Sequence, residues 1–228
     1  MTIVDRTNQT RQRTEHSTVV DIAGVTSSFV RGTQLLQQPS LMFNSNASVD
    51  WIKYNSGLGY LPLAIDIPWV LIQQEAHAMI PHMHRLELGG KDSHGWSNLS
   101  IYLQGEWTTL MPKTVEWFKT QWPCKHFYTI RLLGLDPGGM IGLHTDDCRG
   151  LNNINIAIDH PPECKFVLEN AGVIPFANGT AFAVDTGLRH AVINPSAQLR
   201  LHIAVYHEDN DQYHRVLFNS YEKYCTSS

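Results

Sequence analysis

The segment that decides the fold begins with FYTIRLLGLDPGGMIGLHTD (127–146). Short apolar runs follow at regular intervals: NINIAI (153–158), KFVLEN (165–170), TAFAVD (180–185), HAVIN (190–194) and LRLHIAVY (199–206). Turn-forming sequences such as PGG, DHPPE, ANG and NPS separate them. About seven short strands, with turns roughly every 8–12 residues, predict a β-sandwich or a β-barrel.

Two candidate metal ligands, His144 and Asp146, end the first stretch and lie two residues apart. If the strand continues through them, both side chains project from one face, because side chains alternate along a strand. His190 precedes a later apolar run and can complete the set from a neighbouring strand. Two imidazoles and one carboxylate form the facial triad that leaves three positions open on a non-haem Fe(II). A lone His-x-Asp pair more often makes loop hydrogen bonds, so the prediction depends on His190 and Arg200 following in order.

Arg200 lies in a run where Leu201 and Ile203 alternate with Arg200 and His202. If the polar face is the inside of a barrel, Arg200 is a buried cation that needs an anion. A guanidinium can hold a carboxylate with two hydrogen bonds, so a dicarboxylate cosubstrate suits this position. On the protein surface, the same arginine would instead pair with an acidic neighbour.

Three stretches combine into a recognisable pattern: RLLGLDPGGMIGLHTD (131–146), NGTAFAVDTGLRHAVIN (178–194) and LRLHIAV (199–205). Together they resemble the aspartyl/asparaginyl β-hydroxylase-like group of Fe(II)/2-oxoglutarate oxygenases. The resemblance covers about a third of the chain and does not extend to residues 1–120. It implies a mainly β fold, the double-stranded β-helix or jelly-roll, cupin-like barrel, with a few flanking helices.

The resemblance also implies roles for individual residues. His144, Asp146 and His190 would ligate Fe(II), 2-oxoglutarate and O2 would take the open positions, and Arg200 would bind the distal carboxylate of 2-oxoglutarate. Arg131 matches an arginine that recurs thirteen residues before the first ligand. Its role is open between cosubstrate binding and a structural ion pair.

One departure from the family pattern concerns the strand after the His-x-Asp pair. Relatives often have Arg and His there, two residues apart, where this chain has Asn153 and Asn155. Amides can donate hydrogen bonds but carry no charge. Either Asn153, Asn155 and His202 hold the cosubstrate with less charge, or another cation such as Arg131 or Arg149 takes part.

Candidate substrate contacts are predicted only from their position in loop-like sequence. They are Arg85, His94, Trp96, Arg149 and Arg189. An arginine near the barrel mouth would suit a substrate carboxylate. Each of these residues, taken alone, is more often a solvent-exposed loop residue.

A second His-x-His pair, His82 and His84, is a rival metal site of the kind that simple cupins have. No third ligand or anion-binding arginine is recognisable nearby, so we expect a loop or pocket-wall role. Four cysteines lie far apart without a CxxC pair, which indicates neither a zinc knuckle nor a disulfide framework.

Length and composition predict one enzyme-sized domain. With 228 residues, we predict a flexible arm over 1–17 and a single domain over 18–228, whose core barrel spans about 126–208. Apolar spacing ended by proline predicts helices from Pro68 to just before Pro81 and over Thr114–Trp122.

The charge pattern and the apolar segments limit the partners. A net charge of −4 without a basic run argues against nucleic acid as a partner. Residues 1–20 lack the apolar core of a signal peptide, and no segment approaches the ~18 apolar residues of a membrane span, so we expect a cytoplasmic protein that does not bind membranes. The oligomeric state is left open.

The sequence therefore predicts an Fe(II)/2-oxoglutarate-dependent oxygenase. We expect it to hydroxylate an unactivated C–H bond of a small molecule, such as an amino acid or a natural-product intermediate, with succinate and CO2 as coproducts. One alternative is a peptide or protein side-chain hydroxylase. An alternative of another class is a cupin-like metal-binding protein or hydrolase without 2-oxoglutarate, and Arg200 is the residue that separates it from an oxygenase.

Overall fold

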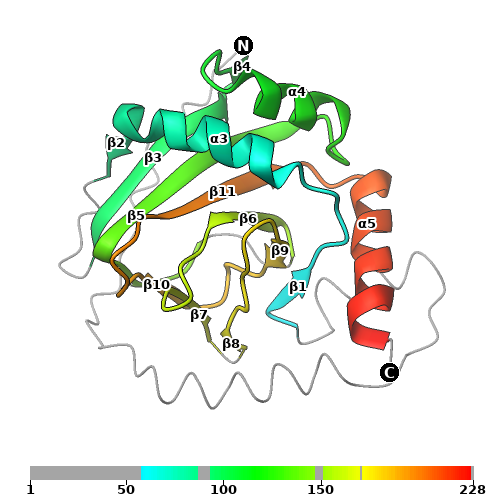
Figure 1. Cartoon of the computed structure of the whole chain (residues 1–228). Coiled ribbons are helices and arrows are strands. Elements are labelled where there is room, and N and C mark those ends of the chain that lie inside the picture. Colours follow the sequence, from blue (N-terminus) through cyan, green and yellow to red (C-terminus); the bar gives the residue numbers. More distant parts are fainter. Residues whose placement is uncertain (1–57, 87–92, 147–150, 170, 227–228) are drawn as a thin grey trace, which may run out of the picture.

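The computed structural model describes residues 58–86, 93–146, 151–169 and 171–226 (Figure 1). The predicted arm over 1–17 lies outside the described residues. The predicted domain start at residue 18 lies outside them too, so both remain predictions.

Eleven strands and three α-helices make up the described part of the chain. The strands are β1 (Tyr60–Pro62), β2 (His84–Arg85), β3 (His94–Leu103), β4 (Glu106–Trp107), β5 (Phe127–His144), β6 (Asn153–Asp159), β7 (Lys165–Leu168), β8 (Gly172–Val173), β9 (Ala181–Val184), β10 (His190–Ile193) and β11 (Arg200–His207). The helices are α3 (Trp69–Met79), α4 (Pro112–Thr120) and α5 (Asp211–Tyr221), with a 3-10 turn at Ile80–His82 and a π-helical turn at Glu222–Thr226.

Strand β5 belongs to two layers of one curled sheet. Its first half, up to Leu135, pairs with β11 on one side and β3 on the other. Its second half, from Met140 onward, pairs with β10. The larger layer therefore runs β1-β9-β6-β11-β5-β3, and the smaller layer runs β5-β10-β7-β8. Two antiparallel layers that share a strand in this order form the predicted jelly roll, so the predicted fold class is confirmed.

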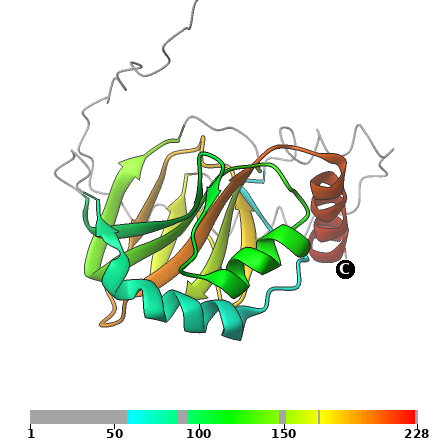
Figure 2. The same ribbon diagram turned by 90° about the horizontal axis from the view of Figure 1, so that it is seen from above.

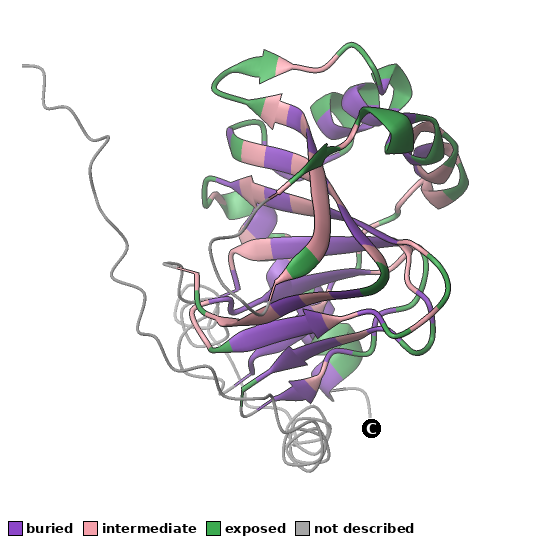
Figure 3. Cartoon of the chain, turned by 90° about the vertical axis from the view of Figure 1, so that its left-hand side faces the viewer, coloured by how far each residue is buried: buried purple, intermediate pink, exposed green. Residues whose placement is uncertain are grey.

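Side chains of the larger layer alternate between two hydrophobic clusters. Leu201 and Ile203 of β11 pack on the side of helices α3, α4 and α5. The opposite face meets the smaller layer in a second cluster that includes Phe166. Arg200 and His202 are out of phase with Leu201 and Ile203 and buried, so they face the barrel interior as the alternation predicts. Figure 3 shows the barrel strands mostly buried and the helices exposed on their outer side.

Helices α3 and α4 cover the outer face of the larger layer, and α5 lies beside its edge strand β1 (Figure 2). Helix α3 matches its prediction, and α4 begins at Pro112, earlier than predicted, because the Glu75 carboxylate accepts hydrogen bonds from the backbone N–H groups of Lys113 and Thr114. Helix α5 was not predicted, although Asn210 caps it in a recognisable way. No helix in the described part of the chain is long and apolar enough to cross a membrane.

Two predicted turns lie within strands. The sequence Pro137-Gly138-Gly139 does not interrupt β5, because Gly138 donates a backbone hydrogen bond to Asn194 and Gly139 accepts one from it. The predicted loop around His94 is the start of β3, which contains an irregularity at Gly95 (φ 72°). Only glycine fits easily there, since a Cβ would lie 3.1 Å from that of Asp136. Hydrogen bonds from neighbouring strands outweigh these local turn preferences.

Candidate metal centre

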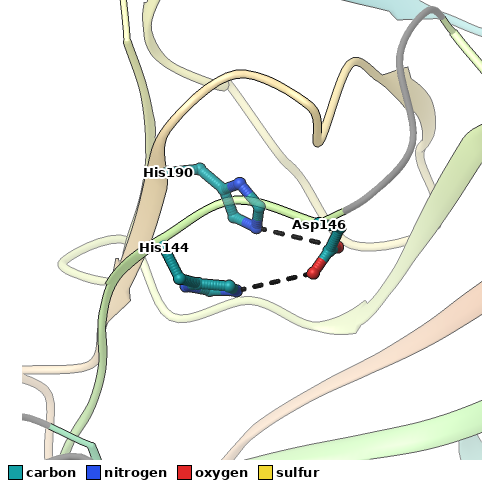
Figure 4. A group of neighbouring side chains, drawn as sticks. All are labelled: His144, Asp146 and His190. Atoms are coloured by element: carbon teal, nitrogen blue, oxygen red, sulfur yellow. Dashed lines mark ion pairs between the residues drawn. The ribbon is translucent and has the colours of Figure 1, made fainter. Parts of the chain in front are cut away.

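His144, Asp146 and His190 lie together at the end of β5 and the start of β10 (Figure 4). His144 is the last residue of β5 and pairs directly with His190, the first residue of β10. Asp146 follows β5, and its backbone N–H donates to the Thr186 carbonyl at 2.8 Å. One candidate ligand atom from each of the three side chains lies within 4.8 Å of the other two. Register and this loop anchor therefore assemble the triad that the sequence predicts.

Backbone carbonyls determine which imidazole nitrogens can bind a metal. His144 Nδ1 lies 2.7 Å from the Gly142 carbonyl, and His190 Nδ1 lies 2.9 Å from the Leu188 carbonyl. A carbonyl only accepts hydrogen bonds, so each Nδ1 carries the hydrogen and each Nε2 keeps its lone pair. Both imidazoles thus present Nε2 as the ligand atom.

The ligand atoms face one another across a gap. His144 Nε2 is 3.9 Å and His190 Nε2 is 4.0 Å from the carboxylate oxygens of Asp146. These distances are too long for hydrogen bonds, so no direct bond between the side chains occupies the lone pairs. Such a gap, lined by two imidazoles and one carboxylate, suits a divalent cation.

The surroundings of His190 keep it neutral. Burial, and then the nearby charge of His144, lower the pKa of His190 to about 4. The ring of Phe166 stacks on its imidazole at 5.4 Å between centroids. The neutral form, which is the one that ligates metals, therefore prevails near neutral pH.

Arg200 is a buried cation that lacks an acidic partner within the described residues. It is 2% exposed, and its Nε has no hydrogen-bond partner among the residues that the structure describes. Burial lowers its pKa only to about 10, so the guanidinium stays charged at neutral pH. A buried charge of this kind is costly unless an anion arrives. The carboxylate of 2-oxoglutarate fits this requirement.

A polar group links the larger layer to the metal centre. Asn155 donates to the Asn153 side chain, and Asn153 donates to the hydroxyl of Thr186, whose carbonyl also anchors Asp146. The two asparagines that stand where relatives have charged residues are therefore connected by hydrogen bonds to the loop that positions Asp146.

Arg131 shares the interior face with Asn155. Arg131 of β5 and Asn155 of β6 both pair with Ala204 of β11, and all three are out of phase with the residues packed under the helices. The Arg131 Nε donates to the Thr129 hydroxyl at 3.2 Å. Among the described side chains it has no acidic partner, so the structural ion pair considered for it is not found there. Arg131 is thus a second cation on the barrel side of the sheet.

The predicted substrate residues do not gather at the triad. Arg85 pairs with Asp136 at 2.9 Å, and His94 contacts the Gly138 carbonyl at 3.0 Å. Both therefore contact the middle of β5, away from His144 at the end of that strand. Trp96 is partly buried against the interior cluster, and its Nε1 has no hydrogen-bond partner in the described part of the chain. Arg189 is exposed beside His190. Arg149 lies outside the described residues.

The rival His-x-His pair has no third ligand within the described part of the chain. His82 and His84 are both exposed, and the described residues contain one cluster of metal-ligating side chains, the triad. His82 ends the 3-10 turn and His84 begins β2, so the predicted loop position is wrong, and the pocket-wall role stays a prediction.

Sequence reasoning missed His160 and Phe166, which contact functional residues. Phe166 stacks on His190, and His160 lies 2.9 Å from the His202 ring nitrogen. His160 sits in the turn DHPPE, where no local pattern marks it. Only the packing of this turn against β11 shows its role.

A jelly roll with a two-histidine, one-carboxylate centre and a buried arginine defines the class of Fe(II)/2-oxoglutarate-dependent oxygenases. A sequence model of the family described as Aspartyl/Asparaginyl beta-hydroxylase matches residues 68–209, and the chain belongs to this family. The protein is therefore a 2-oxoglutarate-dependent non-haem iron oxygenase with Fe(II) and 2-oxoglutarate as cofactors. Membership sets aside the alternative of a cupin-like protein that does not use 2-oxoglutarate.

Solved structures resemble the fold at low sequence identity. A 2OG-Fe(II) oxygenase family oxidoreductase from Burkholderia pseudomallei is 12% identical, with 75% of this chain and 92% of that chain covered and a TM-score of 0.45. A prolyl-4-hydroxylase from Pseudomonas putida is 14% identical over 72% and 98%, with a TM-score of 0.48. AviO1 from Streptomyces viridochromogenes Tue57 is 12% identical over 75% and 98%, with a TM-score of 0.48. No curated protein matches the sequence.

Proposed function

We propose that this oxygenase hydroxylates a C–H bond of a small molecule, such as an amino acid or a natural-product intermediate. His144, Asp146 and His190 hold the iron, and Arg200 binds the distal carboxylate of 2-oxoglutarate. The observation that carries the proposal is the Arg200 guanidinium, which is buried on the barrel interior without an acidic partner among the described residues.

Each residue has a defined task in this proposal. When bound, iron and 2-oxoglutarate supply an O2-dependent oxidation coupled to conversion of 2-oxoglutarate to succinate and CO2. The carbonyls of Gly142 and Leu188 hold the two imidazoles in the tautomer that ligates through Nε2. Phe166 covers one face of His190 and keeps water from it.

Arg131 and Asn155, on the interior face of the larger layer, favour a small-molecule substrate that carries a carboxylate. Arg131 is a cation on the interior face, and the small side chain of Ala204 lies between it and the amide of Asn155. A cation and an amide spaced in this way can hold a second carboxylate, from either the cosubstrate or an amino-acid substrate. The remaining alternative is a peptide or protein side chain as substrate.

An anaerobic titration tests the cofactor part of the proposal. Adding Fe(II) and then 2-oxoglutarate should produce a visible charge-transfer absorption band, which requires chelation of the metal by the cosubstrate. Replacing 2-oxoglutarate with succinate is the matched control, because succinate lacks the keto group that chelates. A protein that binds Fe(II) but shows no difference between the two acids would refute the proposed use of this centre.

A product screen tests the substrate part. Succinate formation from 2-oxoglutarate should rise above its uncoupled rate when a substrate is present among free amino acids, and a hydroxylated product should appear by mass spectrometry. Stimulation by peptides but not by free amino acids would favour the alternative substrate class.

A further inference from the structure

A chain of hydrogen bonds leads from Arg200 away from the metal centre and ends on a backbone carbonyl. Arg200 Nη2 lies 2.9 Å from His202 Nδ1, and His202 Nε2 lies 2.9 Å from His160 Nδ1. His160 Nε2 then lies 3.1 Å from the carbonyl oxygen of Cys164. Three side chains from two separate segments are therefore linked end to end.

The two ends of the chain determine where every hydrogen lies. A guanidinium only donates, so His202 Nδ1 must accept and His202 carries its hydrogen on Nε2. His202 Nε2 then donates to His160 Nδ1, which leaves the hydrogen of His160 on Nε2. The Cys164 carbonyl only accepts, and it receives that hydrogen. One arrangement of two neutral imidazoles satisfies all three bonds.

The surroundings favour the neutral form of both rings. His202 is 0% exposed, and the edge of Phe176 lies against it with centroids 4.7 Å apart. Burial, followed by the charge of Arg200, lowers the pKa of His202 well below its usual value and that of His160 to about 4. The backbone N–H of His160 donates to the Asn178 side chain at 2.7 Å, which holds the turn in place.

We propose that His160 and His202 form a tautomer-locked relay that positions the Arg200 guanidinium to bind the cosubstrate carboxylate. His160 and His202 are positioning residues, because each uses its two ring nitrogens in these hydrogen bonds. Neither histidine therefore has an N–H left to donate to 2-oxoglutarate. Nη2 uses one hydrogen on His202, and Nε, which is buried and has no partner among the described residues, is a donor that the carboxylate can receive. This inference rests on the proposed role of Arg200 in cosubstrate binding.

Loss of His160 should release the lock. Without its acceptor, the Nε2 hydrogen of His202 would be buried and unpaired, which favours rotation of the ring or a move of the hydrogen to Nδ1, where it would face the N–H of Arg200. Two donors repel, so the guanidinium would lose the partner that holds its orientation. Asparagine at position 160 keeps an oxygen near the place of Nδ1 and should preserve the lock, whereas leucine should not.

The first test reads the tautomers directly and needs no cosubstrate. Long-range proton–nitrogen NMR of ¹⁵N-histidine-labelled protein at neutral pH should show His160 and His202 protonated on Nε2 only. His144 and His190 should show the opposite tautomer. A hydrogen on Nδ1 of His202, or a doubly protonated ring, would overturn the relay whatever the enzyme binds.

The second test measures the dissociation constant of 2-oxoglutarate from the anaerobic Fe(II) protein. His160→Leu should weaken binding about 10-fold, equivalent to ~1.4 kcal/mol, while His160→Asn should stay within about 3-fold of wild type. His126→Leu, which changes an exposed histidine, is the matched control and should leave the constant unchanged. Iron affinity should be the same in all four proteins.

The outcomes separate the two proposals. If wild type fails to bind 2-oxoglutarate, the proposed function fails while the NMR test still decides the relay. If wild type binds and His160→Leu binds equally well, the relay is wrong and the proposed function stands. Equal weakening by the leucine and asparagine variants would show that His160 only fills space, which also overturns the relay.

Discussion

Replacing Arg200 with methionine should remove cosubstrate binding without destabilising the protein. Burial shifts the Arg200 pKa from 12.5 to about 10, which corresponds to roughly 3 kcal/mol of unfavourable charge burial. Methionine has a similar length and no charge, so this cost disappears. The change also leaves His202 Nδ1 without its donor, at a cost of about 1–3 kcal/mol. We therefore expect the free energy of unfolding of the unliganded variant to equal that of wild type or to exceed it by up to about 2 kcal/mol.

Ligand-induced thermal shifts measure this prediction. At 2-oxoglutarate concentrations near 100 times the dissociation constant, wild type should gain about 2.7 kcal/mol, or ~5–10 °C in Tm for a domain of this size. Mn(II) can replace Fe(II) in the assay so that no turnover occurs. The Arg200→Met protein should keep the shift caused by metal alone and lose the further shift caused by 2-oxoglutarate.

Arg215→Met is the control, because Arg215 is exposed on α5 and should behave as wild type in every shift. The reasoning is refuted if Arg200→Met loses more than about 3 kcal/mol of stability yet keeps the 2-oxoglutarate shift. That pair of results would mean that Arg200 supports the fold and that the cosubstrate binds elsewhere.

Three further predictions concern other parts of the molecule. Glu75→Ala should destabilise the protein by about 1–2 kcal/mol in a urea titration, because the N-terminus of α4 and the buried Thr114 hydroxyl lose their acceptor. In a Thr114→Val background the loss should be smaller, and an equal loss would contradict the part assigned to the hydroxyl. The free energy of unfolding should fall as pH drops from about 6.5 towards 4, because His160 and His202 have lowered pKa values and the unfolded chain takes up protons that the folded chain excludes. Chemical unfolding at each pH measures this fall, and a flat profile would contradict the prediction. Asp146→Ala should abolish tight Fe(II) binding in equilibrium dialysis while far-UV circular dichroism stays unchanged, and iron bound as in wild type would exclude the triad as the metal site.

Features that repeat with the period of a strand could be predicted from the sequence. The alternation in β11 indicated that Arg200 and His202 share a face, and the structure confirms that this face lies inside the barrel. The two-residue spacing of His144 and Asp146 predicted a common face on one strand, but β5 ends at His144, and the hydrogen bond to Thr186 positions Asp146 instead. Helix α5 was not predicted, although Asn210 is a typical N-cap residue and its side chain accepts a hydrogen bond from the Tyr213 N–H.

Turns were harder to predict, because their local signals compete with tertiary hydrogen bonds. The glycines at 138 and 139 are typical of a turn, yet hydrogen bonds to Asn194 keep β5 continuous through them. His94 and Arg85 were predicted to lie in loops near a pocket, yet both lie in strands and contact the middle of β5 at Asp136 and Gly138. Loop composition alone does not say which end of a barrel a residue faces.

The sequence by itself determined most strands from β5 to β11, the interior face of Arg200 and His202, and the identity of the three candidate ligands. Tertiary structure alone decided that His190 pairs with His144, that Arg200 has no acid beside it among the described residues, and that His160 completes a chain to Cys164. The physical reason is the difference in sequence range of the interactions involved. Alternation along one strand follows from backbone geometry within a few residues, whereas register between strands and the contacts of a buried charge depend on how distant segments pack.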